Sequence, residues 1–141
     1  MIVLAVDDER DVTESIATGL KLKGHEVLCA ESADAAMRIL QKLFQSNEQV
    51  SVILSDLLMP EISGEALFSM VRRGSHFSNV PFAIMSGNAT PDQIKKLALL
   101  GIDGVICKPF TVDALIVALQ ATIKRKEDKE MAEMLKGLKM A

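Results

Sequence analysis

Short apolar runs alternate along the chain with longer segments in which apolar residues recur every three or four positions. The runs have the length of strands and predict five β-strands, at residues 2–6, 26–29, 50–55, 81–85 and 104–107. The intervening segments predict five α-helices, at residues 10–23, 33–45, 64–73, 91–100 and from 112 onward. Five successive strand–helix units predict an α/β fold: a doubly wound, five-stranded parallel sheet with helices on both faces.

Residues that favour helix ends stand at the predicted boundaries. Ser32 and Thr90 are suitable N-caps for the second and fourth helices, and Pro91 fits the first turn of the fourth. Gly24 and Gly101 follow the first and fourth helices, where a left-handed residue commonly ends a helix. The end signals therefore agree with the apolar pattern.

Polar and charged residues stand where four of the predicted strands end. Asp7 and Asp8 follow the first strand, Asp56 the third, and Lys108 the fifth, while Ser86 follows the fourth. In doubly wound folds, ligands bind beyond the carboxyl ends of the strands, where the strand order switches. The pattern therefore predicts that these residues meet in one site.

These residue types suit magnesium-assisted phosphoryl transfer. Carboxylates are the hard oxygen ligands that Mg²⁺ prefers, often together with phosphate oxygens. The Lys108 ammonium can pair with a carboxylate at rest and with a phosphoryl group when one arrives, and Ser86 adds a hydroxyl donor. A carboxylate such as Asp56, with an ordinary pKa of about 3.9, is ionised at neutral pH and can act as the nucleophile without a general base.

Each motif taken alone has a plainer structural interpretation. Asp7 and Asp8 could cap the first helix, and Asp56 could be a loop acid before a turn. Ser86 with the following glycine could be an ordinary turn. The functional interpretation depends on all of them occurring at the correct strand ends.

Composition narrows the classes of partner. The chain has 141 residues and a formal net charge of −3, which favours one domain and argues against nucleic-acid binding. No apolar stretch approaches the roughly 20 residues that cross a bilayer, and no basic n-region opens the chain, so no membrane partner is expected. Cys29 and Cys107 lie in apolar runs, which predicts buried thiols in a reducing, cytoplasmic compartment.

From residue 2 to about residue 123, the chain resembles the receiver domain of bacterial two-component response regulators, of the single-domain, chemotaxis-regulator type. The motifs that carry the resemblance are Val6-Asp7-Asp8-Glu9, Ser55-Asp56-Leu57-Leu58-Met59-Pro60 with Gly64, Met85-Ser86-Gly87 and Cys107-Lys108-Pro109-Phe110. The resemblance implies a flavodoxin-like (β/α)5 fold with strand order 2-1-3-4-5. That order would place the two cysteines on opposite edges of the sheet, too far apart for a disulfide.

The resemblance also implies roles for the residues at the strand ends. Asp56 would accept a phosphoryl group from a histidine kinase or a histidine phosphotransfer protein, and Ser86 and Lys108 would bind the phosphoryl oxygens. The implied magnesium ligands are Asp8 and Asp56, Asp7 through a water molecule, and the backbone carbonyl of Leu58. The protein would be a switch with self-catalysed phosphotransfer and slow autodephosphorylation, acting on an unidentified downstream protein.

Two positions bear on how such a switch would work. Receivers commonly carry Tyr or Phe three residues before the lysine, and this chain has Val105 there. Output is therefore expected to depend on backbone movement after Ser86. Leu58 and Asn88 stand at the two positions that influence access of water to the phosphoryl group, and the apolar Leu58 predicts no accelerated loss of phosphate.

Residues 124–141 follow the part that resembles a receiver, and they predict a charged extension of the fifth helix. Met131, Met134, Leu135 and Leu138 recur there at helical spacing. The segment could be a frayed tail, or a helix that pairs with a second copy or another partner.

Two other functions compete with the phosphorylated switch. One is a binding module with a receiver fold that phosphate does not control. The other is a phosphohydrolase with an aspartyl nucleophile, such as the haloacid dehalogenase type. That type needs a second acid two residues after the nucleophile, where this chain has Leu58.

Overall fold

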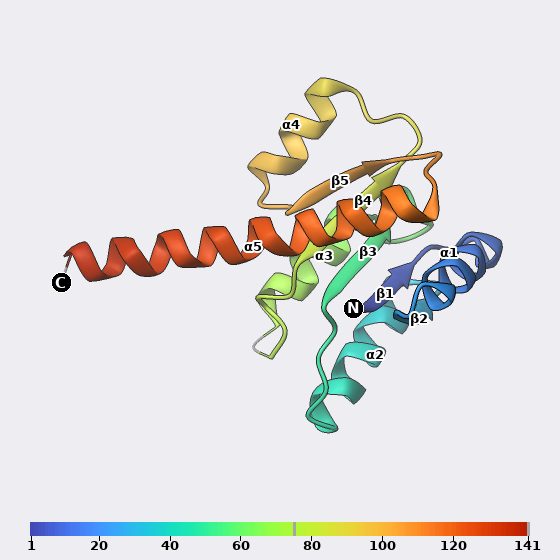
Figure 1. The fold of residues 1–141 in the computed structure, drawn as a ribbon, viewed down its shortest axis with the longest axis horizontal. Helices are drawn as coiled ribbons and strands as arrows, with labels where there is room; N and C mark the ends of the chain where they lie inside the picture. The colour runs from blue at the N-terminus through green and yellow to red at the C-terminus, as the bar shows by residue number, and fades with distance from the viewer. Residues whose placement is uncertain (75, 141) are drawn as a thin grey trace.

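Five β-strands alternate with five α-helices in the computed structural model, which describes residues 1–74 and 76–140, with side chains as far as Leu138 (Figure 1). The strands are β1 (Ile2–Val6), β2 (Glu26–Ala30), β3 (Val52–Asp56), β4 (Phe82–Ser86) and β5 (Gly104–Cys107). The helices are α1 (Arg10–Leu22), α2 (Ala33–Gln45), α3 (Gly64–Arg73), α4 (Pro91–Leu99) and α5 (Val112–Met140). Every predicted element is present, and each bound agrees to within two residues.

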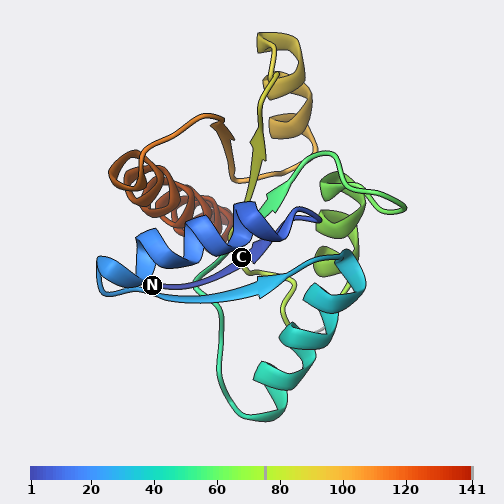
Figure 2. The same ribbon diagram turned by 90° about the vertical axis from the view of Figure 1, so that its right-hand side faces the viewer.

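The five strands form one parallel sheet in the order β2-β1-β3-β4-β5, which confirms the predicted doubly wound fold. Figure 2 shows α1 and α5 on one side of the sheet and α2 and α3 on the other. The strand order switches between β1 and β3, so the carboxyl ends of these two neighbours open onto a common edge.

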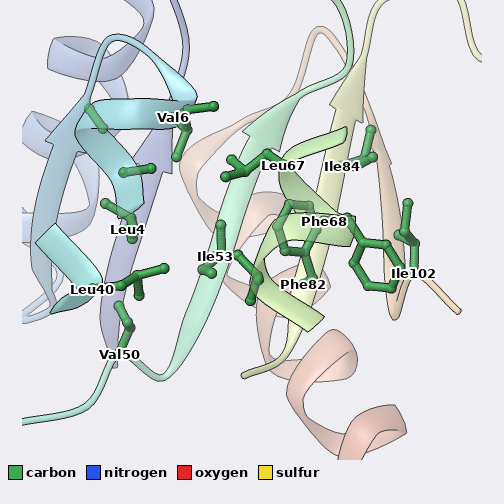
Figure 3. Close-up of a cluster of buried hydrophobic side chains, with 14 of the residues drawn as sticks. Leu4, Val6, Leu40, Val50, Ile53, Leu67, Phe68, Phe82, Ile84 and Ile102 are labelled. Atoms are coloured by element: carbon green, nitrogen blue, oxygen red, sulfur yellow. The ribbon is translucent and has the colours of Figure 1, made fainter. Parts of the chain in front are cut away.

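Two apolar layers hold the helices on the sheet. On one face, strand residues such as Ile53 and Phe82 pack against Leu40 of α2 and Leu67 of α3 (Figure 3). On the other face, alternate strand residues pack against α1 and α5. Because side chains alternate between the two faces and both faces are covered, the central strands are apolar at nearly every position.

The predicted helix ends are confirmed by their hydrogen bonds and backbone angles. The Ser32 and Thr90 hydroxyls accept hydrogen bonds from backbone N–H groups of the first turn, at 3.1 Å and 3.2 Å. Gly24 and Gly101 have φ angles of 87° and 100°, which side chains rarely tolerate. The end of a helix determines where the following strand begins, and so which residues stand at the carboxyl end of that strand.

The prediction of buried cysteines is wrong, because both Cys29 and Cys107 are exposed free thiols. They lie on β2 and β5, the two edges of the sheet. An apolar run identifies a strand, but it does not show whether helices cover that strand fully. At the edges of this sheet the helices leave the cysteine side chains exposed to solvent.

Helix α5 continues to Met140 and projects past the other elements (Figure 1). No glycine or proline interrupts the chain from Val112 to Lys136, so the helix has no internal stop signal there. None of the described helices is both long enough and apolar enough to cross a membrane.

Candidate functional site

Three carboxylates gather at the carboxyl ends of β1 and β3. Oxygen atoms of Asp7, Asp8 and Asp56 lie within 4.8 Å of one another. Lys108, which follows β5, places its Nζ atom 3.2 Å from Oδ1 of Asp56 and 3.5 Å from Oδ2 of Asp7. The structure thus brings together four of the residues that the sequence placed at strand ends.

The pairing of parallel strands produces this arrangement. Asp56 is the last residue of β3 and pairs with Met85, so it lies one residue short of the end of β4. Ser86 ends β4 and accepts a hydrogen bond through its carbonyl from the N–H of Lys108, at 2.8 Å. The Ser86 hydroxyl accepts a hydrogen bond from the N–H of Asn88, at 3.3 Å. Ser86 therefore lies beside Lys108 at the same edge of the sheet.

Asp7 and Asp8 are adjacent in sequence but differ in environment. Asp7 is 1% exposed, whereas Asp8 is exposed. Oδ1 of Asp7 accepts a hydrogen bond from the N–H of Glu9, while its buried Oδ2 makes no hydrogen bond with good geometry among the described residues and has only the Lys108 ammonium, at 3.5 Å, as an ion-pair partner. Burial raises the pKa of the Asp7 carboxyl, outweighing the Glu9 hydrogen bond, and the negative charge of Asp56 adds to the rise.

Lys108 is held in its charged form by the acids around it. Burial alone would lower its pKa, but the hydrogen bond to Asp56 and the charges of Asp56 and Asp7 outweigh burial and raise the pKa. Its side chain is 29% exposed. An ammonium that is charged and partly accessible can exchange its carboxylate partner for an incoming anion.

The carboxylate cluster fits a divalent cation. A single ammonium serves a cluster of three carboxylates, so negative charge remains in excess, and its 3.5 Å contact with the buried Oδ2 of Asp7 is too long to satisfy that oxygen fully. Asp8 is exposed and Asp56 is partly exposed, which leaves the cluster open to solvent on one side. Oxygen ligands in an open, partly hydrated site are the surroundings in which Mg²⁺ binds.

The segment after Asp56 is held close to it by two residues whose contacts sequence reasoning did not identify. Ser55 donates its hydroxyl hydrogen bond to the Asp56 carbonyl at 3.0 Å, and Gly64 donates its N–H to the Leu57 carbonyl at 3.0 Å. A side chain at Gly64 would collide with the Asp56 carbonyl oxygen. A serine inside an otherwise apolar strand was the available sequence signal for the first contact.

The side chain of Leu58 points into solvent, with 78% exposed. Val105 pairs with Ile84 and packs in part against the α2–α3 face of the core. Neither side chain contributes a polar group to the site. Val105 therefore serves as an apolar core contact in this chain.

A sequence model of the response regulator receiver domain matches residues 3–120. The chain is 33% identical over 124 residues to the transcriptional regulatory protein CpxR homolog of Haemophilus influenzae, covering 87% of this chain and 50% of that protein. It is 30% identical over 114 residues to the response regulator protein FleR of Pseudomonas aeruginosa, covering 81% of this chain and 23% of that protein. The chain thus spans about half the length or less of these curated relatives.

Solved structures show the same architecture. The chemotaxis protein CheY4 of Vibrio cholerae superposes with a TM-score of 0.77 at 28% identity, covering 86% of this chain and 97% of that one. A response regulator receiver domain protein from Clostridium thermocellum gives a TM-score of 0.75 at 25% identity, covering 89% and 96%. The matched region includes nearly the whole of both solved chains, whereas it includes half or less of the two curated relatives.

Proposed function

The chain belongs to the response regulator receiver domain family, and we propose that it is a phospho-aspartate switch in which Asp56 accepts a phosphoryl group. The observation that carries the proposal is the ion pair between Lys108 Nζ and Asp56 Oδ1, at 3.2 Å, beside the carboxylates of Asp7 and Asp8. A nucleophilic carboxylate, a mobile cation and further oxygen ligands are the groups that phosphoryl transfer to an acid needs.

In the proposed reaction, a carboxylate oxygen of Asp56 attacks phosphorus, and the bond from phosphorus to the donor breaks as the new P–O bond forms. Lys108 moves its hydrogen bond from the carboxylate to a phosphoryl oxygen, and the Ser86 hydroxyl binds another. A carboxylate nucleophile carries no proton that a base would have to remove.

The residues that would hold Mg²⁺ are Asp8 and Asp56, Asp7 through a water molecule, and the backbone carbonyl of Leu58. When bound, the ion would offset the negative charge that accumulates between the carboxylates and the phosphoryl oxygens. Asp7 contributes a buried oxygen that makes no hydrogen bond and has only a long ion pair to Lys108, which favours a second cation nearby.

We propose a histidine kinase or a histidine phosphotransfer protein as the phosphoryl donor, and a downstream protein as the target of the switch. Receiver domains of this family interact with histidine kinases. Some relatives are named transcriptional regulators, and this chain spans about half the length of one of them. Because the formal net charge of these 141 residues is −3, we propose no nucleic-acid partner for them. The exposed thiols suit the reducing cytoplasm, the compartment we propose.

We divide the chain into a receiver unit, residues 1–123, and a helical extension, residues 124–141. The family match to residues 3–120 supports the first part, and the continuation of α5 to Met140 supports the second. Val105 favours a switch whose output depends on backbone movement after Ser86.

Incubation with acetyl phosphate and Mg²⁺, followed by intact-mass spectrometry, tests the proposed function. The wild type should gain the mass of one phosphoryl group, Asp56→Asn should gain none, and Asp34→Asn, a change of an exposed acid of α2 outside the acidic cluster, should behave like the wild type. Absence of an adduct in every variant would indicate a binding module that phosphate does not control. Continuous phosphate release without a stable adduct would indicate a phosphohydrolase.

A further inference from the structure

The part of α5 beyond the receiver unit is held in place by Asp103, which precedes β5. The Arg125 guanidinium donates a hydrogen bond to the Asp103 carbonyl at 2.7 Å, and Lys129 Nζ donates to Oδ1 at 3.0 Å. Arg72 and the N–H of Phe82 donate to the other carboxylate oxygen, at 2.9 Å and 3.0 Å. We call this set of contacts the Asp103 anchor.

The Asp103 anchor makes the extension a fixed element as far as Lys129. Asp103 is 2% exposed, so its carboxylate requires the donors that surround it. One of those donors, Lys129, and the Arg125 group that donates to the Asp103 backbone carbonyl come from turns of α5 beyond residue 123. A frayed tail is therefore inconsistent with the structure over residues 124–129.

An apolar stripe begins two residues after Lys129. Its members are Met131, Met134, Leu135 and Leu138, with 58%, 66%, 50% and 73% of their surfaces exposed. At 3.6 residues per turn they share a sector about 100° wide, centred about 170° around the helix from Lys129. The stripe thus faces away from the receiver unit to which the helix is anchored, and its own chain does not cover it.

We propose that a second copy of this chain covers the apolar stripe, with the two helices antiparallel. The spacing of the stripe is symmetric about its midpoint, which lies between Met134 and Leu135. A two-fold axis at that midpoint places Met131 opposite Leu138 of the partner subunit, and Leu138 opposite Met131 of the partner subunit. Unbranched methionine adapts well to such a small contact.

The charged residues that precede the apolar stripe argue against a parallel arrangement of the two helices. Glu127 and Lys124 continue the face of the stripe toward the receiver unit. Parallel helices would place each of these residues against the same residue of the other copy, and like charges at a helix seam repel. In the antiparallel arrangement the two Glu127 residues are about 22 Å apart along the helix axis, beyond the Debye length of about 8 Å at physiological salt.

The small size of the stripe sets the strength of the pairing. Four side chains per copy are far fewer than the roughly 20–30 residues on each side of a standard interface. We therefore expect a dimer that forms only at high concentration, on the order of 0.1–1 mM. The pairing does not involve Asp56, so it can be tested on the unphosphorylated chain, and its failure would leave the proposed phosphotransfer untouched.

Disulfide cross-linking tests the orientation. Met131→Cys and Leu138→Cys are made separately in a Cys29→Ser/Cys107→Ser background, with tags that distinguish the two by mass, and mixed under mild oxidation. Antiparallel pairing predicts that the mixed product forms about tenfold faster than either self-linked product, because only the mixed pair of thiols has a high effective concentration. Predominant self-linking of each variant would indicate parallel helices and overturn the proposal.

Light scattering between about 10 µM and 1 mM tests the contact itself. The wild type should show a mass that rises toward the dimer, and Leu135→Glu should remain monomeric. Leu22→Glu is the matched control, because Leu22 is 82% exposed on α1, outside the extension, and it should behave like the wild type. A monomeric wild type throughout, or equal loss of association in both variants, would contradict the proposal.

Discussion

Asp7 lies in an environment that disfavours its ionised side chain. Its carboxylate is buried, one of its oxygens makes no hydrogen bond among the described residues, and burial raises its pKa. A group in this state destabilises the fold whenever it is ionised without a cation. Lys108, 3.5 Å from Oδ2 of Asp7, offsets part of that cost, and a metal ion bound nearby would offset more of it.

Asp7→Asn should stabilise the protein at pH 7 in the absence of divalent metal, by about 1 kcal/mol. The folded pKa of Asp7 is raised from the ordinary 3.8, so the folded state holds its proton more tightly than the unfolded state. Stability is therefore lost as pH rises from 3.8 through the folded pKa. Urea unfolding should show a smaller gain for the variant at pH 4 than at pH 7.

The wild type and Asp7→Asn also show whether Asp7 helps to bind a metal ion or is merely a buried acid. Mg²⁺ should raise the melting temperature of the wild type more than that of Asp7→Asn, since a ligand that binds only the folded state stabilises it by mass action. Asp34→Asn provides a control for the loss of one surface charge. Equal shifts of the melting temperature in all three proteins would mean that Asp7 takes no part in metal binding.

Leu58 offers water no hydrogen-bonding partner near the acceptor, since its exposed side chain is purely apolar. Leu58→Asn should shorten the lifetime of the phosphorylated protein about tenfold, equivalent to about 1.4 kcal/mol in the barrier. Decay of the adduct, followed by mass spectrometry after removal of acetyl phosphate, measures this. If the phosphorylated wild type decayed within seconds, this interpretation of Leu58 would be contradicted.

At the scale of elements, the site depends on where β3 ends and α3 begins. The chain leaves Asp56, makes a loop, and returns so closely that only hydrogen fits at Gly64 beside the Asp56 carbonyl. Within that loop Glu61 has a φ of 69°, a left-handed conformation that an ordinary side chain adopts at some energetic cost. The tight return holds the backbone of Asp56 and Leu57 against the start of α3, where Gly64 donates its N–H to the Leu57 carbonyl.

Gly64→Ala should lower the free energy of unfolding by about 1–3 kcal/mol, because the added methyl group must displace backbone that cannot yield cheaply. Gly87→Ala is the matched control, since a Cβ there meets nothing within 4 Å. The control should stay within about 0.5 kcal/mol of the wild type in urea unfolding. Similar losses in both variants would show that glycine itself, and not the close approach, matters.

At the scale of the whole molecule, Asp103 joins both faces of the sheet. Arg72 of α3 lies on one side, and Arg125 and Lys129 of α5 lie on the other. Burial lowers the pKa of Arg72, and the charge of Asp103 opposes that effect, so the pair is partly withdrawn from water. As far as Lys129, the extension is in this way tied to the body of the fold.

Lys129→Met should destabilise the protein by about 1–2 kcal/mol, because it leaves a buried carboxylate oxygen without its donor. Lys124→Met removes a lysine from the same helix whose partner, Asp128, is exposed, and should change stability by less than about 0.5 kcal/mol. Chemical unfolding of the two variants measures the difference. Equal effects would mean that the Asp103 anchor contributes no more than a surface ion pair.

The sequence by itself determined the elements, their ends and the residues at the strand ends, because apolar period, capping hydroxyls and glycines are local properties. Strand order came from family resemblance. Only the tertiary structure decided which of two adjacent acids, Asp7 or Asp8, is buried, and that the edge cysteines are exposed. It alone showed that Asp103 meets Arg72 and Lys129. These outcomes depend on which distant segments cover a position, and burial and the pairing of remote charges are not encoded in any local pattern.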